Sequence, residues 1–497
     1  MMKRLTGLDG VSLHGETAVM PTHVMAVFFC EAEVRGELTA GAIARLLVER
    51  TAATPVFRQR LLAKPLGLGQ PVWVDDPDFH AGDHVHRLWL RKPGTLRELA
   101  ALVGDLHEQR LDRNHPLWQA WVVQGLNDGR LAVVLKFSHA MSDGVGAVTS
   151  ILPELMTSDP DHQFPAPVLR TPAAGPGVSE LMGDLIDEIA ANTTAGARLA
   201  LRVAPRVAQN AAGSVRALMR RLLPTSSPSG AEVPEGDQGT PRTRLNAPIT
   251  ARRSVAFAAV GMDDLRIIAD AYGVTVNDVF LTATTSALRR WLHRYDSVPD
   301  RPLRTFMPIS TRGAEDTGSN RWSPAVVTLP VHLADPVHQL TAIHAATARV
   351  KHRRREARPV DLAEVIDLVP PVVVGMAAGL YTGLKLSRWH PPLAHLITSN
   401  VPGPRTAIYC AGARVRGVYP LAPLCDGSNL NVTAVSYGGR FTIGLVACPD
   451  NVEDVGSVAR GIEDVVAELR DAAREKAGSN SGVVRSGRLA RPLSEPA

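Results

Sequence analysis

His139 is the histidine whose sequence surroundings best suit catalysis. It lies in the segment Ser138-His139-Ala140-Met141-Ser142-Asp143-Gly144, and no other histidine of the chain has an aspartate four residues later. A histidine with an ordinary pKa of about 6.5 accepts a hydroxyl proton at neutral pH, so it can act as a general base directly on a substrate. Asp143 would hold the loop in place by pairing with an arginine. The alternative is a core histidine satisfied by a backbone carbonyl group at a strand end.

Other catalytic chemistries have weaker support in the sequence. Ser138 and His139 are adjacent on an extended segment, so we expect their side chains on opposite faces, which argues against a Ser-His nucleophile pair. No G-x-S-x-G elbow, P-loop or H-E-x-x-H occurs, and the histidines show no metal-ligand spacing. Gly144 and Gly146 follow a strand pattern, but Thr149 stands where a dinucleotide turn needs a third glycine. The sequence therefore favours general-base chemistry and predicts no metal site.

The elements that position His139 can be read from the flanking patterns. The apolar run Leu131 to Phe137, broken only by Lys136, predicts a strand buried on both faces. A neighbouring strand, Trp118 to Val123, is joined to it by the turn Asn127-Asp128-Gly129. A strand that ends at His139 would present the imidazole at the mouth of a cavity. Earlier strands and helices are expected at Val24–Phe29, Ala40–Ala53, Leu88–Leu90 and Thr95–Arg110, a succession that indicates a layered α/β domain.

The length of the chain, 497 residues, exceeds one ordinary core, so we expect two domains. Residues 1–160 would form the domain with the His139 motif, 161–245 a Pro- and Ala-rich connector, and 246–470 a second α/β domain. Residues 471–497 are expected to be disordered, because the sequence from Lys476 is rich in Gly, Ser, Arg and Pro. Elements of the second domain are expected at Val255–Val260, Asp263–Tyr272, Asp278–Tyr295, Val326–Val331, Asn429–Ser436 and Phe441–Val446.

Composition limits the class of protein and its partners. Hydrophobic residues at 45% and charged residues at 21% are typical of a globular chain, and the net charge of +5 suits nucleic acid, CoA phosphates or anionic lipid alike. The four cysteines show no pairing or metal spacing, which favours a reducing cytoplasm. Leu368–Leu384 is uncharged but shorter than the about 20 residues of a spanning helix, so we expect a buried or lipid-facing helix.

The connector has a basic helical pattern. Helical periodicity runs from Val178 to Leu223, and between Glu188 and Glu232 there is no acid but six arginines: Arg198, Arg202, Arg206, Arg216, Arg220 and Arg221. Spacings of four residues place several of them on one helical face beside apolar residues, which suggests contact with an anionic membrane or lipid surface. A solvated helix packed across two domains is the alternative.

Several blocks together resemble one known family. SHAMSDG, from Ser138 to Gly144, resembles the HHxxxDG motif of the bacterial wax ester synthase/acyl-CoA:diacylglycerol acyltransferase family. The resemblance covers about residues 5 to 470, with further blocks in the family's order at Leu13–Glu16, Pro21–Val24, Leu111–Trp118, Val276–Val279 and Thr398–Pro404.

The resemblance implies a fold, an activity and partners. It implies two chloramphenicol-acetyltransferase-like α/β domains joined by a long helical crossover, with the His139 motif in a channel between them. The family transfers a long-chain acyl group from acyl-CoA to diacylglycerol or a long-chain alcohol, so acyl-CoA would be a co-substrate, with no bound cofactor and no nucleic-acid partner. The protein would be cytoplasmic, and peripheral contact with the inner membrane face or with lipid droplets is a further expectation. His139 would deprotonate the acceptor hydroxyl, and the alkoxide would attack the thioester.

The same resemblance assigns expectations to other residues. The tetrahedral oxyanion would need a hydrogen-bond donor, for which Asn277 is a candidate; the alternative is a helix N-cap before Asp278. Asp143 and Gly144 match the family motif, whereas its first histidine is Ser138 here, which predicts a changed inner packing or hydrogen bond and an intact base. We expect the wall of the site to be shaped by buried Pro116, Leu117 and Trp118, and the backbone to be placed by a rigid turn at Asn400–Pro404.

Two alternatives remain beside a neutral-lipid O-acyltransferase. One is acyl transfer to a non-lipid acceptor, and the pocket lining would separate it from the lipid enzyme. The other is a weakly active or degenerate paralogue that binds lipid or a membrane surface through the basic connector without turnover.

Overall fold

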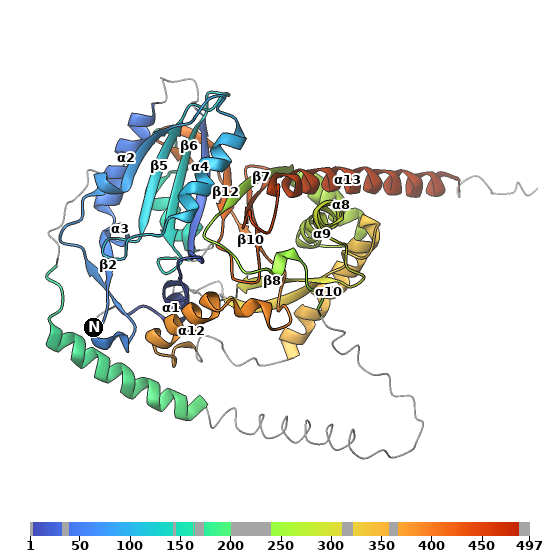
Figure 1. Ribbon diagram of the computed structural model, residues 1–497. Coiled ribbons are helices and arrows are strands. Elements are labelled where there is room, and N and C mark those ends of the chain that lie inside the picture. The colour runs from blue at the N-terminus through green and yellow to red at the C-terminus, as the bar shows by residue number, and fades with distance from the viewer. Residues whose placement is uncertain are drawn as a thin grey trace, which may run out of the picture.

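The computed structural model describes residues 3–31, 39–142, 146–162, 164, 173–199, 240–310, 322–356 and 366–486. Within them, two mixed six-stranded sheets lie side by side, each covered by helices (Figure 1). The layered α/β fold expected from the sequence is therefore confirmed. Among the described residues, no helix combines the length and the hydropathy that crossing a membrane requires.

The first sheet is built around strand β6, which carries the residues before His139. Its strand order is β11-β12-β1-β6-β5-β4, and β4 is parallel to β5 while the other pairs are antiparallel. Gly129, with φ of 78°, occupies the turn between β5 and β6, where a positive φ suits glycine. The strands are β1 (His23–Glu31), β4 (Val85–Trp89), β5 (Trp118–Gln124), β6 (Leu131–Ser138), β11 (Tyr409–Cys410) and β12 (Ala413–Leu421).

Both faces of this sheet are covered, which explains the near-continuous apolar sequence of β6. Helix α2 (Ala40–Ala53) packs Ile43 and Leu47 against one face, and α4 (Leu96–Glu108) packs Val103 against the other. Every residue of β6 is consequently buried. Smaller elements complete this half: α1 (Gly7–His14), α3 (Pro55–Arg58), the two-stranded ribbon β2 (Gln59–Leu62) with β3 (Val72–Asp75), and α6 (Leu152–Leu155).

The second sheet has the order β7-β14-β13-β10-β8-β9, with β10 parallel to both β13 and β8. Four helices cover one face and form the largest apolar core with it. The strands are β7 (Ser254–Gly261), β8 (Leu303–Ser310), β9 (Trp322–Leu329), β10 (Leu396–Pro402), β13 (Leu430–Tyr437) and β14 (Arg440–Ala447). The helices are α8 (Met262–Tyr272), α9 (Val276–Tyr295), α10 (Pro336–Glu356) and α13 (Val455–Ser486).

A strand from the second half of the chain completes the first sheet. β12 pairs along most of β1, from Met25 opposite Leu421 to Glu31 opposite Arg414. Behind it lies β14, where a side chain at Gly444 would overlap the carbonyl oxygen of Pro420. Because the first sheet incorporates residues from beyond 400, the two halves of the chain share one set of backbone hydrogen bonds.

Three sequence expectations about local structure need correction. The expected disorder from residue 471 is wrong as far as Ser486, because α13 packs Ile462 and Leu469 into the core and continues as a helix. Asn400–Pro402 belongs to strand β10 instead of a turn, because it pairs with β13. The Leu368–Leu384 segment forms α12 (Pro371–Gly383), most of whose large apolar side chains are exposed, which excludes the buried alternative.

The connector is described in part. A helix spans residues 178–199, and Arg198 at its end is exposed. The other five arginines named for the basic pattern, at 202, 206, 216, 220 and 221, lie outside the described residues.

Candidate active site

His139 lies in the turn that begins where β6 ends, as the strand pattern predicts. Its side chain is half-buried, and the turn is closed by a 2.9 Å hydrogen bond from Met141 N to the carbonyl oxygen of Ser138. Ala140 N also donates to Ser138 Oγ, at 3.2 Å. A short side chain at position 138 therefore stabilises the turn that carries the imidazole. Asp143 and Gly144 lie outside the described residues.

The Pro116–Trp118 block forms a wall directly beside this turn. Ser138 N donates to Leu117 O at 2.8 Å, and Leu117 packs with Ala140 and Met141, which flank His139 in sequence. Trp118 is fully buried, and its Nε1 donates to Phe57 O at 2.8 Å. All three residues of the block are buried, as expected from the sequence. The surroundings of His139 on this side are consequently rigid and apolar.

Behind β6 lies a buried group of basic side chains that the sequence reasoning missed. Lys136 is completely buried, and its Nζ donates to the carbonyl oxygens of Leu106, at 2.8 Å, and Gln109. The buried rings of His23 and His107 lie 4.7 Å apart between centroids, and His23 is opposite Ser138 across β1 and β6. Burial lowers the pKa of Lys136 to about 7 and that of His107 to about 3. The signal in the sequence was the single charge within β6.

Lys136 should make stability depend on pH. Its pKa is about 7 when folded and 10.5 in its ordinary state, so the unfolded chain binds the proton more tightly. The free energy of unfolding should therefore increase between pH 7 and about 10, by at most about 1.4 kcal/mol per pH unit. It should decrease again as the pH is lowered from about 10 to 7. Lys136→Met should remove this slope, measured by urea unfolding at several pH values, whereas Lys351→Met, at an exposed position on α10, should keep it. Equal slopes in all three proteins would contradict the assignment.

Asn277 does not cap helix α9, so that alternative is wrong. Thr275 is the N-cap: its side chain accepts from Asp278 N, and the Asp278 carboxylate accepts from Thr275 N at 3.0 Å. The carboxylate three residues after Thr275 can reach back to the cap, which fixes the start of the helix two residues before the sequence suggested. The Asn277 amide is half-buried and its Nδ2 lies 3.8 Å from Met307 Sδ. Its role as an oxyanion donor stays a prediction.

Asp278 joins α9 to α10 in the core of the second half. Its carboxylate, fully buried, also accepts from His344 Nδ1 at 2.9 Å and from Thr347 Oγ1 at 2.7 Å. Burial alone would raise the pKa of Asp278, but the hydrogen bonds from His344, Thr275 and Thr347 outweigh it and hold this pKa below its ordinary value. These contacts are sufficient to explain an aspartate at this position structurally.

The Thr398–Pro404 block is brought to the first sheet by the packing of the two halves. Val401, in β10, belongs to the same buried apolar cluster as Phe137 and Trp118, which lie next to the His139 turn. Gly403 approaches Ser436 O so closely that a Cβ could not fit. This block therefore contributes backbone placement and packing beside the candidate site.

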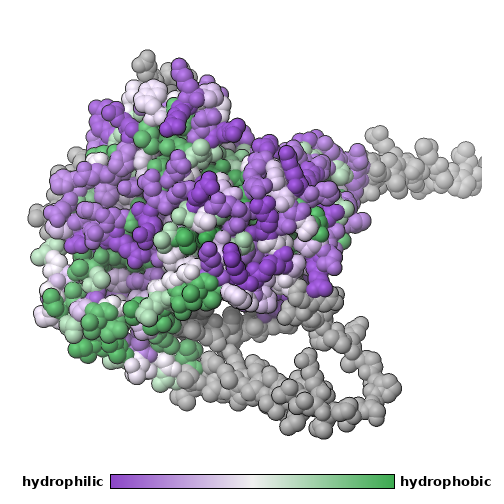
Figure 2. All heavy atoms as spheres, in the orientation of Figure 1, coloured by the Kyte–Doolittle hydropathy of each residue, from purple (hydrophilic) through white to green (hydrophobic). Residues whose placement is uncertain are grey.

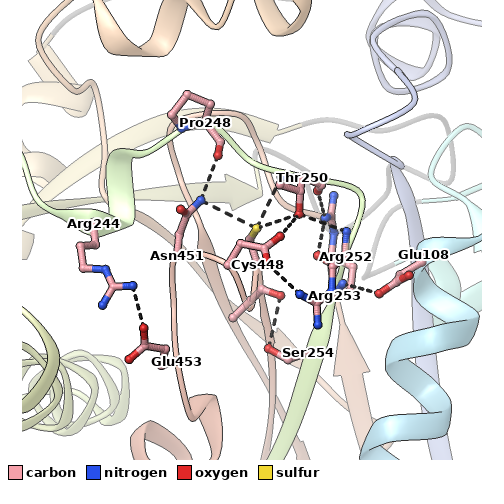
Figure 3. A network of polar contacts seen from close by, with 12 residues as sticks. Glu108, Arg244, Pro248, Thr250, Arg252, Arg253, Ser254, Cys448, Asn451 and Glu453 are labelled. Carbon is pink, nitrogen blue, oxygen red and sulfur yellow. Dashed lines mark hydrogen bonds and ion pairs between the residues drawn. The ribbon is translucent and has the colours of Figure 1, made fainter.

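The two halves are also joined where the connector enters β7 (Figure 3). Arg253 N donates to Glu108 Oε1, at the end of α4, at 2.9 Å, and Arg253 Nη2 donates to Val19 O at 2.8 Å. On the other side, Thr250 contacts Cys448 Sγ, and Arg244 pairs with Glu453 at 2.8 Å. This polar network fixes the first sheet and its helix α4 against the second sheet.

A metal centre has no support in the part of the chain that the structure describes. No group of three His, Cys, Asp or Glu side chains there is arranged to hold an ion.

Comparison with known proteins agrees with the motif blocks. The sequence matches the wax ester synthase/diacylglycerol acyltransferase catalytic domain over residues 5–280 and the C-terminal domain of the same family over residues 318–470. A putative diacylglycerol O-acyltransferase of Mycobacterium tuberculosis H37Rv is 32% identical over 483 residues, covering 96% of this chain and 92% of the relative. A probable diacylglycerol O-acyltransferase of the same strain is 32% identical over 479 residues, covering 94% and 96%.

Solved structures show the same relationship. The wax ester synthase/diacylglycerol acyltransferase of Marinobacter aquaeolei VT8 superposes with a TM-score of 0.69 at 26% identity, covering 95% of this chain and 100% of that one. A trichothecene 15-O-acetyltransferase of Fusarium sporotrichioides shares the fold, with a TM-score of 0.53 at 13% identity and coverage of 95% and 94%. The chain therefore belongs to the wax ester synthase/diacylglycerol acyltransferase family and is an acyl-CoA-dependent acyltransferase.

Proposed function

We propose that this chain transfers a long-chain acyl group from acyl-CoA to the hydroxyl group of diacylglycerol or of a long-chain alcohol, with His139 as the general base. The observation that carries the proposal is the position of His139, half-buried in a turn at the end of a fully buried strand. Membership of the family, whose named relatives are diacylglycerol O-acyltransferases, supports the substrate class.

The reaction needs one proton acceptor and one oxyanion donor. His139 takes the proton of the acceptor hydroxyl, and the oxygen attacks the thioester carbonyl carbon. The tetrahedral intermediate collapses as the carbon–sulfur bond breaks, and the CoA sulfur leaves with the proton held by the imidazolium. Asn277 Nδ2 is proposed to donate to the oxyanion, and Asp143 to orient the loop, each as the family motif implies.

The acceptor is proposed to be a lipid because of what lies around the turn. Leu117, Ala140 and Met141 belong to an apolar cluster that continues to Leu5 and Leu13 of the N-terminal segment. Apolar surroundings of the base suit an acyl chain better than a polar acceptor. Ser138 in place of the family's first motif histidine favours, as a second candidate, a weakly active paralogue that binds lipid.

The test is ester formation from radiolabelled palmitoyl-CoA with dioleoylglycerol or hexadecanol, separated by thin-layer chromatography. We expect labelled ester from the wild type, with the dominant product naming the acceptor. A gain in Ser138→His would show that the missing histidine limits the rate. No ester above background from the wild type or from Ser138→His would overturn the proposal and leave the lipid-binding paralogue.

A further inference from the structure

Two helices leave wide apolar surfaces uncovered on one face of the molecule. Figure 2 shows hydrophobic side chains gathered along the lower part of this face, where Figure 1 places α12 and the helix 178–199. We use "apolar platform" for the exposed residues Val178, Met182, Ile186, Ile189, Val372, Val373, Met376, Leu380 and Leu384. Met376 is 70% exposed and Ile186 is 62% exposed. Contiguous apolar surface on this scale marks an interaction site.

The helix 178–199 has two apolar stripes, one packed against the protein and one exposed. Leu181 and Leu185 are buried and attach the helix to the body of the protein. Met182, Ile186 and Ile189 follow one another at three- and four-residue spacing, so they form a separate stripe on the exposed side.

Helix α12 is unusual in a different way, because it contains no charged residue from Pro371 to Gly383 and yet lies on the surface. Trp389 and Leu393, which follow it, are 82% and 78% exposed. An exposed tryptophan beside an apolar helix is typical of the boundary between lipid and water.

The two helices belong to one continuous surface. Asn192 Nδ2, on the helix 178–199, donates to Asp367 O, shortly before α12, at 3.1 Å. Ile189 and Leu368 line a common pocket with Leu68, from the loop between β2 and β3. In the same loop Leu66 is held at φ of 61° and is 82% exposed, an uncommon conformation for leucine.

The exposed charges just after α12 are basic, whereas the helix 178–199 carries the exposed acids Glu180 and Asp187. No acidic residue occurs between Asp367 and Asp426, and Lys385 and Arg388, just after α12, are exposed. Two acids on the inner side of the helix 178–199 are neutralised from within: Asp184 pairs with Arg4 and with Lys64, each at 2.6 Å, and Glu188 pairs with Lys64. The α12 part of the platform therefore combines apolar side chains with cations, which matches an anionic phospholipid surface.

The platform is connected to the candidate site through α1. Helix α12 packs on α1, where Gly7 N donates to Asp367 Oδ1 at 2.6 Å. Leu13, at the end of α1, belongs to the apolar cluster that includes Leu117 and Ala140 beside His139. One layer of helix thus separates the exposed apolar surface from the residues that flank the proposed base.

We propose that the apolar platform docks on an anionic phospholipid bilayer and so places the proposed active site at the surface where an apolar acceptor resides. The choice of a bilayer as the partner rests on the proposed function, because an enzyme with a lipid acceptor meets that acceptor at a bilayer surface. The docking itself is independent of catalysis, and it is tested without acyl-CoA.

The test is co-sedimentation with vesicles of phosphatidylcholine and phosphatidylglycerol. The double variant Met376→Glu/Leu380→Glu should bind at least about tenfold less than the wild type, because two carboxylates would enter the bilayer interface. Ile267→Glu is the matched control: Ile267 is 37% exposed on α8, outside the platform, and its replacement should leave binding unchanged. Lys385→Ala/Arg388→Ala should lower binding to these vesicles and abolish their advantage over pure phosphatidylcholine vesicles.

A second measurement follows the wild type directly. Brominated lipids should quench the tryptophan fluorescence of the wild type, and Trp389→Phe should lose most of this quenching. Equal binding by the wild type and the platform variant would overturn the proposal, as would binding to triacylglycerol droplets alone. A wild-type dimer that dissociates in Met376→Glu/Leu380→Glu would also overturn it, since a second copy would then cover the surface.

Discussion

Replacing His139 with alanine is expected to lower kcat for acyl transfer by about 10²–10⁴-fold, the usual contribution of a positioned general base. The reason is chemical, because the alanine has no group that can take the hydroxyl proton of the acceptor. The fold should tolerate the change, since His139 is half-buried and the turn keeps the hydrogen bonds that Met141 N and Ala140 N donate to Ser138.

The comparison requires a histidine that is remote from the proposed chemistry. His80→Ala serves, because His80 is exposed, and it should transfer acyl groups at the wild-type rate. The wild-type rate should also decrease at acidic pH as the base becomes protonated. Any residual activity of His139→Ala should not show this decrease. Transfer by His139→Ala at the wild-type rate, with an unchanged pH profile, would exclude His139 as the base.

Gly444→Ala is expected to lower the free energy of unfolding by about 3 kcal/mol, at the upper end of overpacking effects. A Cβ at this position would overlap Pro420 O, a backbone atom of β12 that cannot turn aside as a side chain could. In the same region Thr442 Oγ1 donates to Val418 O, so β14 and β12 are also joined by a hydrogen bond. Either β12 moves away from β14, or β12 loses its pairing with β1 in the first sheet.

Thermal unfolding followed by circular dichroism measures this effect. Gly183→Ala, in the helix 178–199, is the control, because a Cβ there meets nothing within 4 Å and alanine favours the helix. We expect the midpoint of Gly183→Ala to equal or exceed that of the wild type, and that of Gly444→Ala to fall by several degrees. If both variants unfolded like the wild type, β12 would not be held closely against β14.

Much of the architecture could be predicted because its signals are local. The apolar run of β6, the turn at Gly129 and the amphipathic pattern of α4 each depend on residues close in sequence, and the structure has the elements where these patterns placed them. Helix ends were less certain. Asn277 was a plausible cap until the structure showed that Asp278 reaches back to Thr275.

The sequence by itself determined the α/β elements, the strand that ends at His139, and, through its motif blocks, the family. Only the tertiary structure decided which distant segments complete the site. It placed β12 beside β1, gathered Lys136, His23 and His107 behind β6, and left α12 exposed. The physical reason is that pairing and burial depend on contacts between residues far apart in the sequence, and periodicity along one segment carries no information about which surface will cover it.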